Sequence, residues 1–444
     1  MSDPRAVTYQ QLLDTDTHDV PAVLRIDSRL EGGLDRIPIE RYTSRAFFEL
    51  EVERLWRRVW QMACREEDIP EVGDQLVYDI AGLSILVVRV ASDRIKAYWN
   101  ACLHRGRALR DERGRAGTIR CPFHGWCWKL DGSLAEVPAG WDFPHVDWEA
   151  NSLPEVQVDT WGGFVFVNPD PDAGPLAEHL GELPAHFTRW PLEKRYKAAH
   201  VAKILRCNWK VAQEAFMEAY HVVGTHPQLM VSLGDSNTQN DVFETFSRSM
   251  TPNGTPSPHV RERPSEQELA NGVLDLDYEA PSPVTIPEGS TARTVLAERR
   301  RDVLRPVLGE GADELCDAEL MDSFYYTLFP NLHPWGAYNR IVYRFRPLGT
   351  DHRQSIMEVM FLEPLPEGPR PKSAPIHWLG PDDDWVEAPE LGMLARVFNQ
   401  DNFNLPRQQI GLETSARSHV QVSKYNESRL RHFHGLLDQW LFPD

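Results

Sequence analysis

Two short segments of the sequence carry matched pairs of metal-ligating side chains. The first holds Cys102 and His104, and the second holds Cys121 and His124 after the interval 105–120. Two thiolates and two imidazoles bind either one zinc ion or a [2Fe–2S] cluster, whose thiolates hold one iron and whose imidazoles hold the other. Zinc fingers pair Cys with Cys and then His with His, whereas here each segment supplies one of each. The order of ligands therefore favours the cluster.

A second group of ligand types follows in the middle of the chain. Glu214, Glu218 and His221 have the spacing of one helix face, and His226 stands where Pro227 must end that helix. Two histidines and one carboxylate from elsewhere build the face of a non-haem Fe(II) site that leaves positions open for O₂. Glu218 itself is one candidate for that carboxylate.

Together the two groups resemble the catalytic alpha subunit of Rieske non-haem iron ring-hydroxylating oxygenases, from about Ile37 to the C-terminus. The resemblance rests on the two metal motifs in the family's order and on their neighbours Asn100, His104-Arg105-Gly106, Cys121-Pro122-Phe123-His124-Gly125-Trp126 and Asn208-Trp209-Lys210. It implies that Cys102, His104, Cys121 and His124 hold the cluster and that His221 and His226 hold Fe(II).

The resemblance also implies a third iron ligand and an electron path. In the family an Asp precedes a Gln-x-Gly-Leu segment by eight residues, which here matches Asp401 before Gln409. The family commonly has Asp where this chain has Glu218, and that residue bridges to a cluster histidine of the neighbouring subunit, here His124. Some amine-oxidising members carry Glu at this position.

The elements that must position these residues change in character along the chain. Apolar residues at helical spacing predict a helix over 42–64, and short alternating runs then predict strands over 74–80, 83–90, 95–99, 118–121, 127–130 and 163–167. The turn-rich stretch 168–175 indicates a domain boundary. Beyond it we expect strands over 198–207, 242–249, 323–328, 340–346 and 356–361, and helices over 211–223, 294–304 and 391–398.

This pattern predicts an N-terminal arm (1–40), a small all-β domain with a leading helix (41–168) and a larger α+β domain (169–444). The segment 251–290, rich in Pro, Gly, Ser and acidic residues, is expected to be a long excursion that covers a pocket mouth. The fold class is therefore α+β. The resemblance makes the first domain a Rieske [2Fe–2S] domain and the second a helix-grip-like catalytic domain with an antiparallel sheet and mononuclear iron.

Composition excludes several other classes of protein. The formal net charge of −19 argues against nucleic acid and anionic lipid as partners. Residues 1–20 have neither a basic nor an apolar signal region, and no apolar run is long enough to span a bilayer, so we expect a cytoplasmic chain. Six cysteines cannot form a disulfide framework in 444 residues.

The resulting prediction is the terminal component of a multicomponent oxygenase that mono- or dihydroxylates a hydrophobic, aromatic small molecule with O₂. Hydroxylation or demethylation of an amine is the alternative, and an electron carrier without oxygenase activity is the alternative of another class. Phe216 and Met217 are the expected pocket residues. Because the sequence has no nucleotide-binding glycine motif, electrons from NAD(P)H must come through a separate reductase, with or without a ferredoxin. The family implies a homotrimer or a multiple of three, with or without a small beta subunit.

Overall fold

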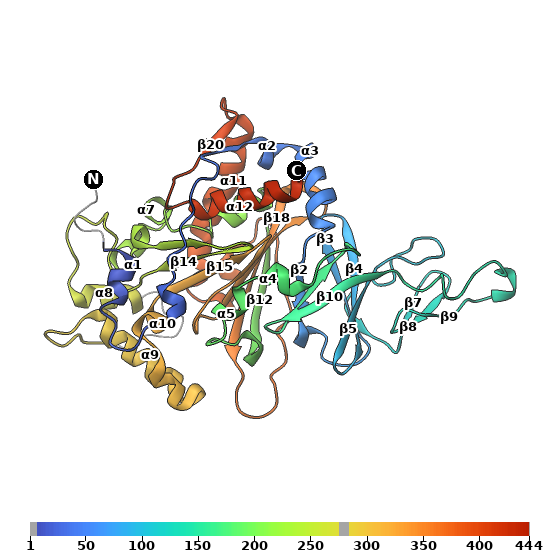
Figure 1. Cartoon of the computed structure of the whole chain (residues 1–444), viewed down its shortest axis with the longest axis horizontal. Helices are drawn as coiled ribbons and strands as arrows, with labels where there is room; N and C mark the ends of the chain where they lie inside the picture. Colours follow the sequence, from blue (N-terminus) through green and yellow to red (C-terminus); the bar gives the residue numbers. More distant parts are fainter. Residues whose placement is uncertain (1–6, 275–283, 444) are drawn as a thin grey trace.

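An antiparallel seven-stranded sheet forms the first half of the computed structural model, which describes residues 7–274 and 284–443. Its strand order is β2-β11-β10-β5-β4-β3-β6. The strands are β2 (Gln61–Arg65), β3 (Asp74–Ile80), β4 (Leu83–Ala91), β5 (Arg94–Trp99), β6 (Gly114–Arg115), β10 (Glu155–Trp161) and β11 (Phe164–Asn168). A separate small sheet of β7 (Thr118–Arg120), β8 (Cys127–Lys129) and β9 (Leu134–Glu136) extends from it at the right-hand end of Figure 1.

An eight-stranded sheet forms the core of the second half, within the described residues. Its order is β13-β14-β15-β16-β17-β18-β12-β19, antiparallel except where β12 pairs with β19. The strands are β12 (Arg195–Leu205), β13 (Gln239–Val242), β14 (Phe246–Thr251), β15 (Ser323–Leu328), β16 (Leu332–Pro334), β17 (Ile341–Leu348), β18 (Asp351–Pro364) and β19 (His377–Leu379). A two-stranded pair, β1 (Arg36–Pro38) with β20 (His419–Gln421), ties the N-terminal arm to the C-terminal region.

Helices surround the larger sheet, with α11 and α12 on its upper side in Figure 1 and α8 and α9 at its lower left. The α-helices are α1 (Tyr9–Leu13), α2 (Glu40–Thr43), α3 (Arg45–Glu51), α4 (Leu176–Leu180), α5 (Leu183–His186), α6 (Trp209–Glu214), α7 (Val222–Thr225), α8 (Glu266–Leu274), α9 (Ala292–Leu308), α10 (Asp317–Met321), α11 (Leu394–Thr414) and α12 (Ser428–Leu441). Short η elements connect them: η1 (Ala22–Arg25), η2 (Val52–Trp56), η3 (Glu66–Asp68), η4 (Gly140–Asp142), η5 (Leu192–Lys194), η6 (Pro227–Val231), η7 (Asp235–Asn237), η8 (Gly309–Glu314), η9 (Trp385–Glu387) and η10 (Pro389–Leu391).

The expected fold class is confirmed, but some expected boundaries are wrong. The helix expected over 42–64 is broken between α2 and α3 and ends with η2 at Trp56, and its last residues form strand β2. Pairing with β11 buries every residue of β2, so tertiary pairing overrides the helical spacing of the apolar residues. The strand expected over 242–249 is instead a hairpin of β13 and β14, closed by the hydrogen bond from Phe243 N–H to the Phe246 carbonyl.

The segment 251–290 contains a helix rather than only an irregular excursion. Helix α8 packs its apolar face on α9, and both belong to one hydrophobic cluster. Residues 275–283 lie outside the described part of the chain.

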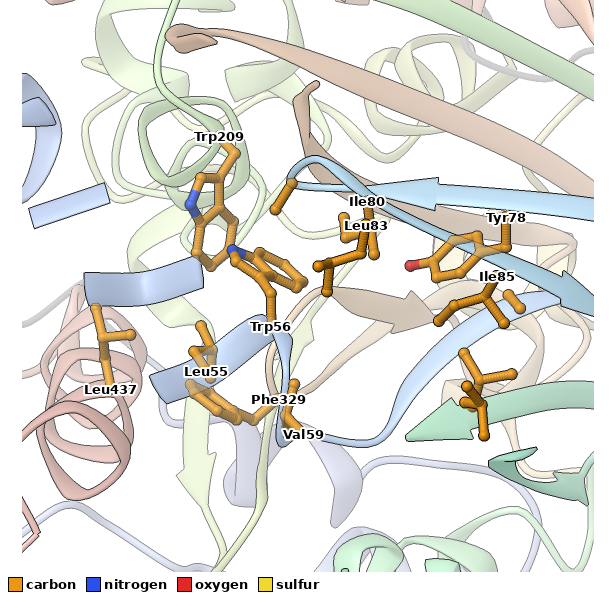
Figure 2. Close-up of a cluster of buried hydrophobic side chains, with 14 of the residues drawn as sticks. Leu55, Trp56, Val59, Tyr78, Ile80, Leu83, Ile85, Trp209, Phe329 and Leu437 are labelled. Atoms are coloured by element: carbon orange, nitrogen blue, oxygen red, sulfur yellow. The ribbon is translucent and has the colours of Figure 1, made fainter. Parts of the chain in front are cut away.

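A shared hydrophobic core joins the two halves. Trp56 of η2 and Trp209 of α6 lie with ring centroids 5.0 Å apart, edge to face, as Figure 2 shows. Ile80 and Ile85 from the first sheet and Leu437 from α12 belong to the same buried cluster. Because interiors are close-packed and stiff, this cluster holds the start of α6 in a fixed position relative to the first sheet.

Two expectations from composition concerned membrane-spanning segments and disulfide bonds. Within residues 7–274 and 284–443, no helix combines the length and the apolar character needed to cross a bilayer. All six cysteines are buried, and none of them forms a disulfide in this structure. Among them, Cys127 packs within the β8 hairpin with its sulfur 3.8 Å from the Trp128 carbonyl.

Candidate metal centres and the adjoining cavity

Three side chains from distant parts of the sequence converge in the catalytic half. Ligand atoms of His221, His226 and Asp401 all lie within 4.8 Å of one another. The distance from Asp401 Oδ1 is 2.9 Å to His226 Nε2 and 3.6 Å to His221 Nε2. Two imidazoles and one carboxylate with this convergence match the facial set that holds non-haem Fe(II).

The backbone that carries the two histidines differs from the single helix that the spacing predicts. Helix α6 ends at Glu214, and α7 begins only at Val222. Between them, Glu218 Oε2 accepts a hydrogen bond from the His221 backbone N–H at 2.9 Å. A carboxylate that takes a backbone donor in this way competes with the helical ladder, so the side chain of Glu218 helps to explain why the helix is interrupted. Glu214, Glu218 and His221 therefore do not share one continuous helix face.

Asp401 reaches the site from the middle of α11. Its side chain is buried, unlike the solvated acid that an average helical Asp would be. A buried carboxylate is costly unless a charged or hydrogen-bonding partner compensates it. Here the partners are the two imidazoles. Their contact with the buried carboxylate supports a ligand role for Asp401 rather than that of a solvated acid.

Hydrogen bonds on the far side of each imidazole direct its Nε2 towards Asp401. Glu218 Oε1 lies 2.7 Å from His221 Nδ1, and Gln400 Oε1 lies 2.7 Å from His226 Nδ1. Because both oxygens are acceptors, each Nδ1 carries a proton, and Nε2 is the nitrogen of each ring that can bind a metal once it is unprotonated. Gln400 also accepts from Gln228 Nε2 at 2.7 Å. No spacing in the sequence marks these two glutamines.

Two carboxylates, those of Glu218 and Asp401, act on the His221 ring at this centre. Burial of the His221 ring opposes its protonation, but the Glu218 carboxylate and then Asp401 outweigh burial and raise the pKa of His221 to about 9. The two carboxylates therefore attract positive charge to the point where the ring nitrogens meet.

The other predicted ligand group lies in two matched loops at the tip of the first half. Cys102 and His104 follow β5, and Cys121 and His124 lie between β7 and β8. The backbone N–H of Gly106 donates to the Cys102 carbonyl, and that of Gly125 donates to the Cys121 carbonyl. Both glycines have a positive φ, of 75° and 78°, which side chains rarely adopt.

The burial and spacing of the four side chains suit a bound metal group. Both sulfurs are buried, and the imidazoles of His104 and His124 lie with centroids 4.7 Å apart. His104 Nδ1 is buried and finds no hydrogen-bond partner in the described part of the chain, as expected of an atom reserved for a metal.

Two features mark the surroundings of these loops: backbone amides point at the Cys102 sulfur, and an aromatic ring covers His104. Burial raises the pKa of the Cys102 thiol, while the backbone N–H groups of His104 and Arg105 favour its thiolate. Trp126 stacks on His104 with centroids 5.2 Å apart. His124 is exposed, and the exposed Phe123 ring lies beside it. One edge of the loop pair is therefore open to a partner.

A cavity of about 620 Å³ opens beside the iron triad. His221, His226 and Asp401 line it, together with Glu218 and the expected pocket residue Phe216. Met217, the other expected pocket residue, does not line it: the side chain is fully buried in the core cluster around Trp56. The place of Met217 in the core therefore differs from the pocket position expected for it.

The rest of the wall comes from elements that sequence reasoning did not connect to the site. Tyr325, Trp335 and Tyr343 reach the cavity from the β15–β17 region, and Leu274 reaches it from α8. The expected cover over 251–290 therefore contributes to the wall through α8. Helices α9 and α11 supply further lining residues, Arg299, Arg300, Val303, Leu304, Leu394, Val397 and Phe398.

Comparison with known families is consistent with both sites. Residues 185–442 match the family described as ring hydroxylating alpha subunit (catalytic domain), and residues 59–146 match the Rieske [2Fe-2S] domain. The first match covers more than half of the chain, so the protein belongs to the ring-hydroxylating alpha subunit family. Its cofactors are accordingly a [2Fe–2S] cluster and a non-haem iron, and the zinc alternative is set aside.

Curated relatives match over part of their length. The carnitine monooxygenase oxygenase subunit of Escherichia coli is 32% identical over 194 residues, which are 43% of this chain and 52% of the relative. The glycine betaine monooxygenase oxygenase subunit of Pseudomonas aeruginosa is 30% identical over 200 residues, 44% and 46% of the two chains. The anthranilate 1,2-dioxygenase large subunit of Acinetobacter baylyi is 33% identical over 209 residues, 45% and 44%. The chain spans about half the length of the curated relatives it matches.

Solved structures share the fold over nearly the whole chain. A quaternary ammonium Rieske monooxygenase in complex with L-carnitine superposes with a TM-score of 0.65 at 18% identity, covering 91% of this chain and 95% of that one. A naphthalene 1,2-dioxygenase mutant bound to phenanthrene gives a TM-score of 0.62 at 18% identity, covering 91% and 92%. Because these similarities cover 91% of this chain, both halves share the fold of the solved structures.

Proposed function

We propose that this chain is the terminal oxygenase component of a Rieske non-haem iron system. Fe(II) would be held by His221, His226 and Asp401, and the cluster by Cys102, His104, Cys121 and His124. The observation that carries the proposal is the convergence of the iron triad on the wall of a cavity large enough for a small organic molecule. When bound, the iron centre and the cluster supply O₂ activation and electrons.

The chain's own residues would position these groups and the substrate. Glu218 and Gln400 hold the two imidazoles in the tautomer that a metal requires. Phe216 and the aromatic residues of the sheet exclude water and contact an apolar substrate. We infer domain limits of 1–40, 41–168 and 169–444, which the two family matches fall within or close to.

Electron delivery would occur between subunits of a homotrimer. His124 and Phe123 are exposed at the loop tip, and Tyr220 is exposed beside the iron-binding segment. Glu218 is partly accessible and already holds His221, so it is suited to carry a hydrogen-bonded path from the neighbour's cluster loop to the iron. Reduction of the cluster would require a separate reductase, directly or through a ferredoxin.

Two substrate classes have support. The aromatic lining of the cavity favours a hydrophobic or aromatic compound. Glu at position 218 and the relatives that oxidise carnitine and glycine betaine favour an amine, with hydroxylation or demethylation as the outcome. The cavity accommodates either class by volume.

The proposal is tested by turnover under ¹⁸O₂. Iron-loaded protein, NADH and a surrogate reductase would be incubated with anthranilate, carnitine, glycine betaine and naphthalene. We expect a product that is heavier by one or two labelled oxygen atoms, or formaldehyde released by demethylation. Cluster reduction without labelled product from any amine or aromatic compound would instead favour the electron carrier.

A further inference from the structure

One wall of the cavity is cationic. Arg299 and Arg300 of α9 line the same cavity as the iron triad, next to the apolar residues Val303 and Leu304. A hydrophobic substrate alone gives no reason for guanidinium groups on a pocket wall, because they would have to lose hydration on binding.

The carboxylates that line this cavity already have partners. Glu218 holds His221, and Asp401 lies against His226. The remaining pairs are Glu363 with Arg340 at 2.7 Å, Asp322 with Arg293 at 2.5 Å and Glu319 with Arg189 at 3.1 Å. Among the described residues, none of these lining carboxylates forms an ion pair with Arg300.

Arg300 is the residue on which the inference rests. It is half-buried, and its Nη1 donates to the Leu320 carbonyl at 2.8 Å, which fixes the guanidinium at the wall. Over the described residues, no carboxylate forms an ion pair with it. A guanidinium has five donors in a planar fork that suits a carboxylate, and the Leu320 bond uses one of them.

Aromatic rings line another part of the same cavity. Phe216 and Tyr343 have centroids 5.2 Å apart, and Trp335 lies 5.4 Å from Tyr325 and 6.0 Å from Tyr343. Such rings favour an apolar body or an ammonium group. The cavity therefore combines an anion-binding wall, an aromatic wall and the iron triad.

We propose that the substrate is a small organic carboxylate whose anionic end binds Arg300, so that the opposite end of the molecule lies against the iron triad. This inference rests on the proposed oxygenase function and specifies its substrate class. The carboxylate would anchor the molecule by charge-assisted hydrogen bonds, and the aromatic wall would hold either a ring or a methylated amine.

The test compares binding of matched compounds with and without a carboxylate. Calorimetric titration of the iron-loaded full chain would use anthranilate against aniline and glycine betaine against tetramethylammonium. We expect the acid of at least one pair to bind at least about tenfold more tightly than its counterpart. The pair that shows the preference distinguishes an aromatic acid from an aliphatic betaine.

Variants assign the preference to the guanidinium. Arg300→Gln should abolish the preference and leave the uncharged or carboxyl-free compounds unchanged, whereas Arg300→Lys should retain part of it. Arg305→Gln is the matched control, because Arg305 lies on the same helix but is exposed and pairs with Asp302 and Asp313. No preference in either pair, no binding of either acid at millimolar concentration, or a preference that survives Arg300→Gln would overturn the inference. These readouts need no turnover, so they remain separate from failure of the oxygenase assay.

Discussion

The two metal centres of this chain are built in different ways. The cluster loops are local: each contributes one Cys and one His within a few residues, and backbone hydrogen bonds and positive-φ glycines shape both. The iron site is assembled from afar, because His226 and Asp401 are 175 residues apart. A local site depends mainly on its own loops, whereas the iron site depends on the packing of α6, α7 and α11 against the larger sheet.

The largest effect is expected when the distant carboxylate of the iron site, Asp401, is removed. Asp401→Ala should lower the mononuclear iron from about one per chain to nearly none and abolish turnover, because two imidazoles alone hold Fe(II) weakly. The visible spectrum of the cluster should be unchanged. Iron analysis and absorption spectroscopy measure both effects. Asp382→Ala is the control, since Asp382 is exposed and pairs with Arg206. Full iron retention in Asp401→Ala would mean that another residue is the ligand.

The reciprocal change should remove the cluster alone. Cys121→Ser is expected to eliminate the cluster's visible absorption and its sulfide while the iron triad still binds Fe(II), because the two sites share no residue. Cys127→Ser, six positions further along the same hairpin, should keep the cluster. Retention of sulfide in Cys121→Ser would show that the loops are misassigned.

A third change should slow electron transfer between the two sites while both keep their metals. In Glu218→Gln one oxygen can still accept the His221 Nδ1 proton, but the negative charge is lost. We expect both metals to remain and the oxidation of the reduced cluster in a single turnover to slow by about 10- to 100-fold. Stopped-flow absorption measures that rate. Glu413→Gln, on an exposed pair with Arg353, serves as the control, and an unchanged rate in Glu218→Gln would contradict the bridging role.

The smallest expected effect concerns the support of a ligand. Gln400→Ala removes the acceptor for His226 Nδ1–H and should weaken Fe(II) binding by about tenfold, measured by competition with a chelator. Gln228→Ala removes only the contact to Gln400 and should have a smaller effect. Equal affinities for Gln400→Ala and the unmodified chain would show that packing alone orients the imidazole.

The difference between the centres also explains what the sequence could predict. Cys102, His104, Cys121 and His124 could be proposed as cluster ligands because ligand order and spacing within short loops are visible in one dimension. His221 and His226 were visible for the same reason, but the helix expected around them was wrong because the Glu218 side chain takes the His221 amide from the backbone ladder.

Residues brought in by tertiary packing were harder to predict. Asp401 came from a family resemblance rather than from spacing, and nothing local distinguished it from a solvated acid. Gln400, Trp335 and Arg300 were missed because their relation to the site exists only after α9 and α11 pack around the sheet. Met217 packs in the core cluster around Trp56, a position that also depends on tertiary packing.

The most direct test of the central claim, that one chain holds both centres, is the ratio of iron to acid-labile sulfide in the purified, iron-loaded protein. A [2Fe–2S] cluster together with a mononuclear site predicts about three irons and about two sulfides per chain. About two irons with two sulfides would mean that the triad binds no iron, and would contradict the account.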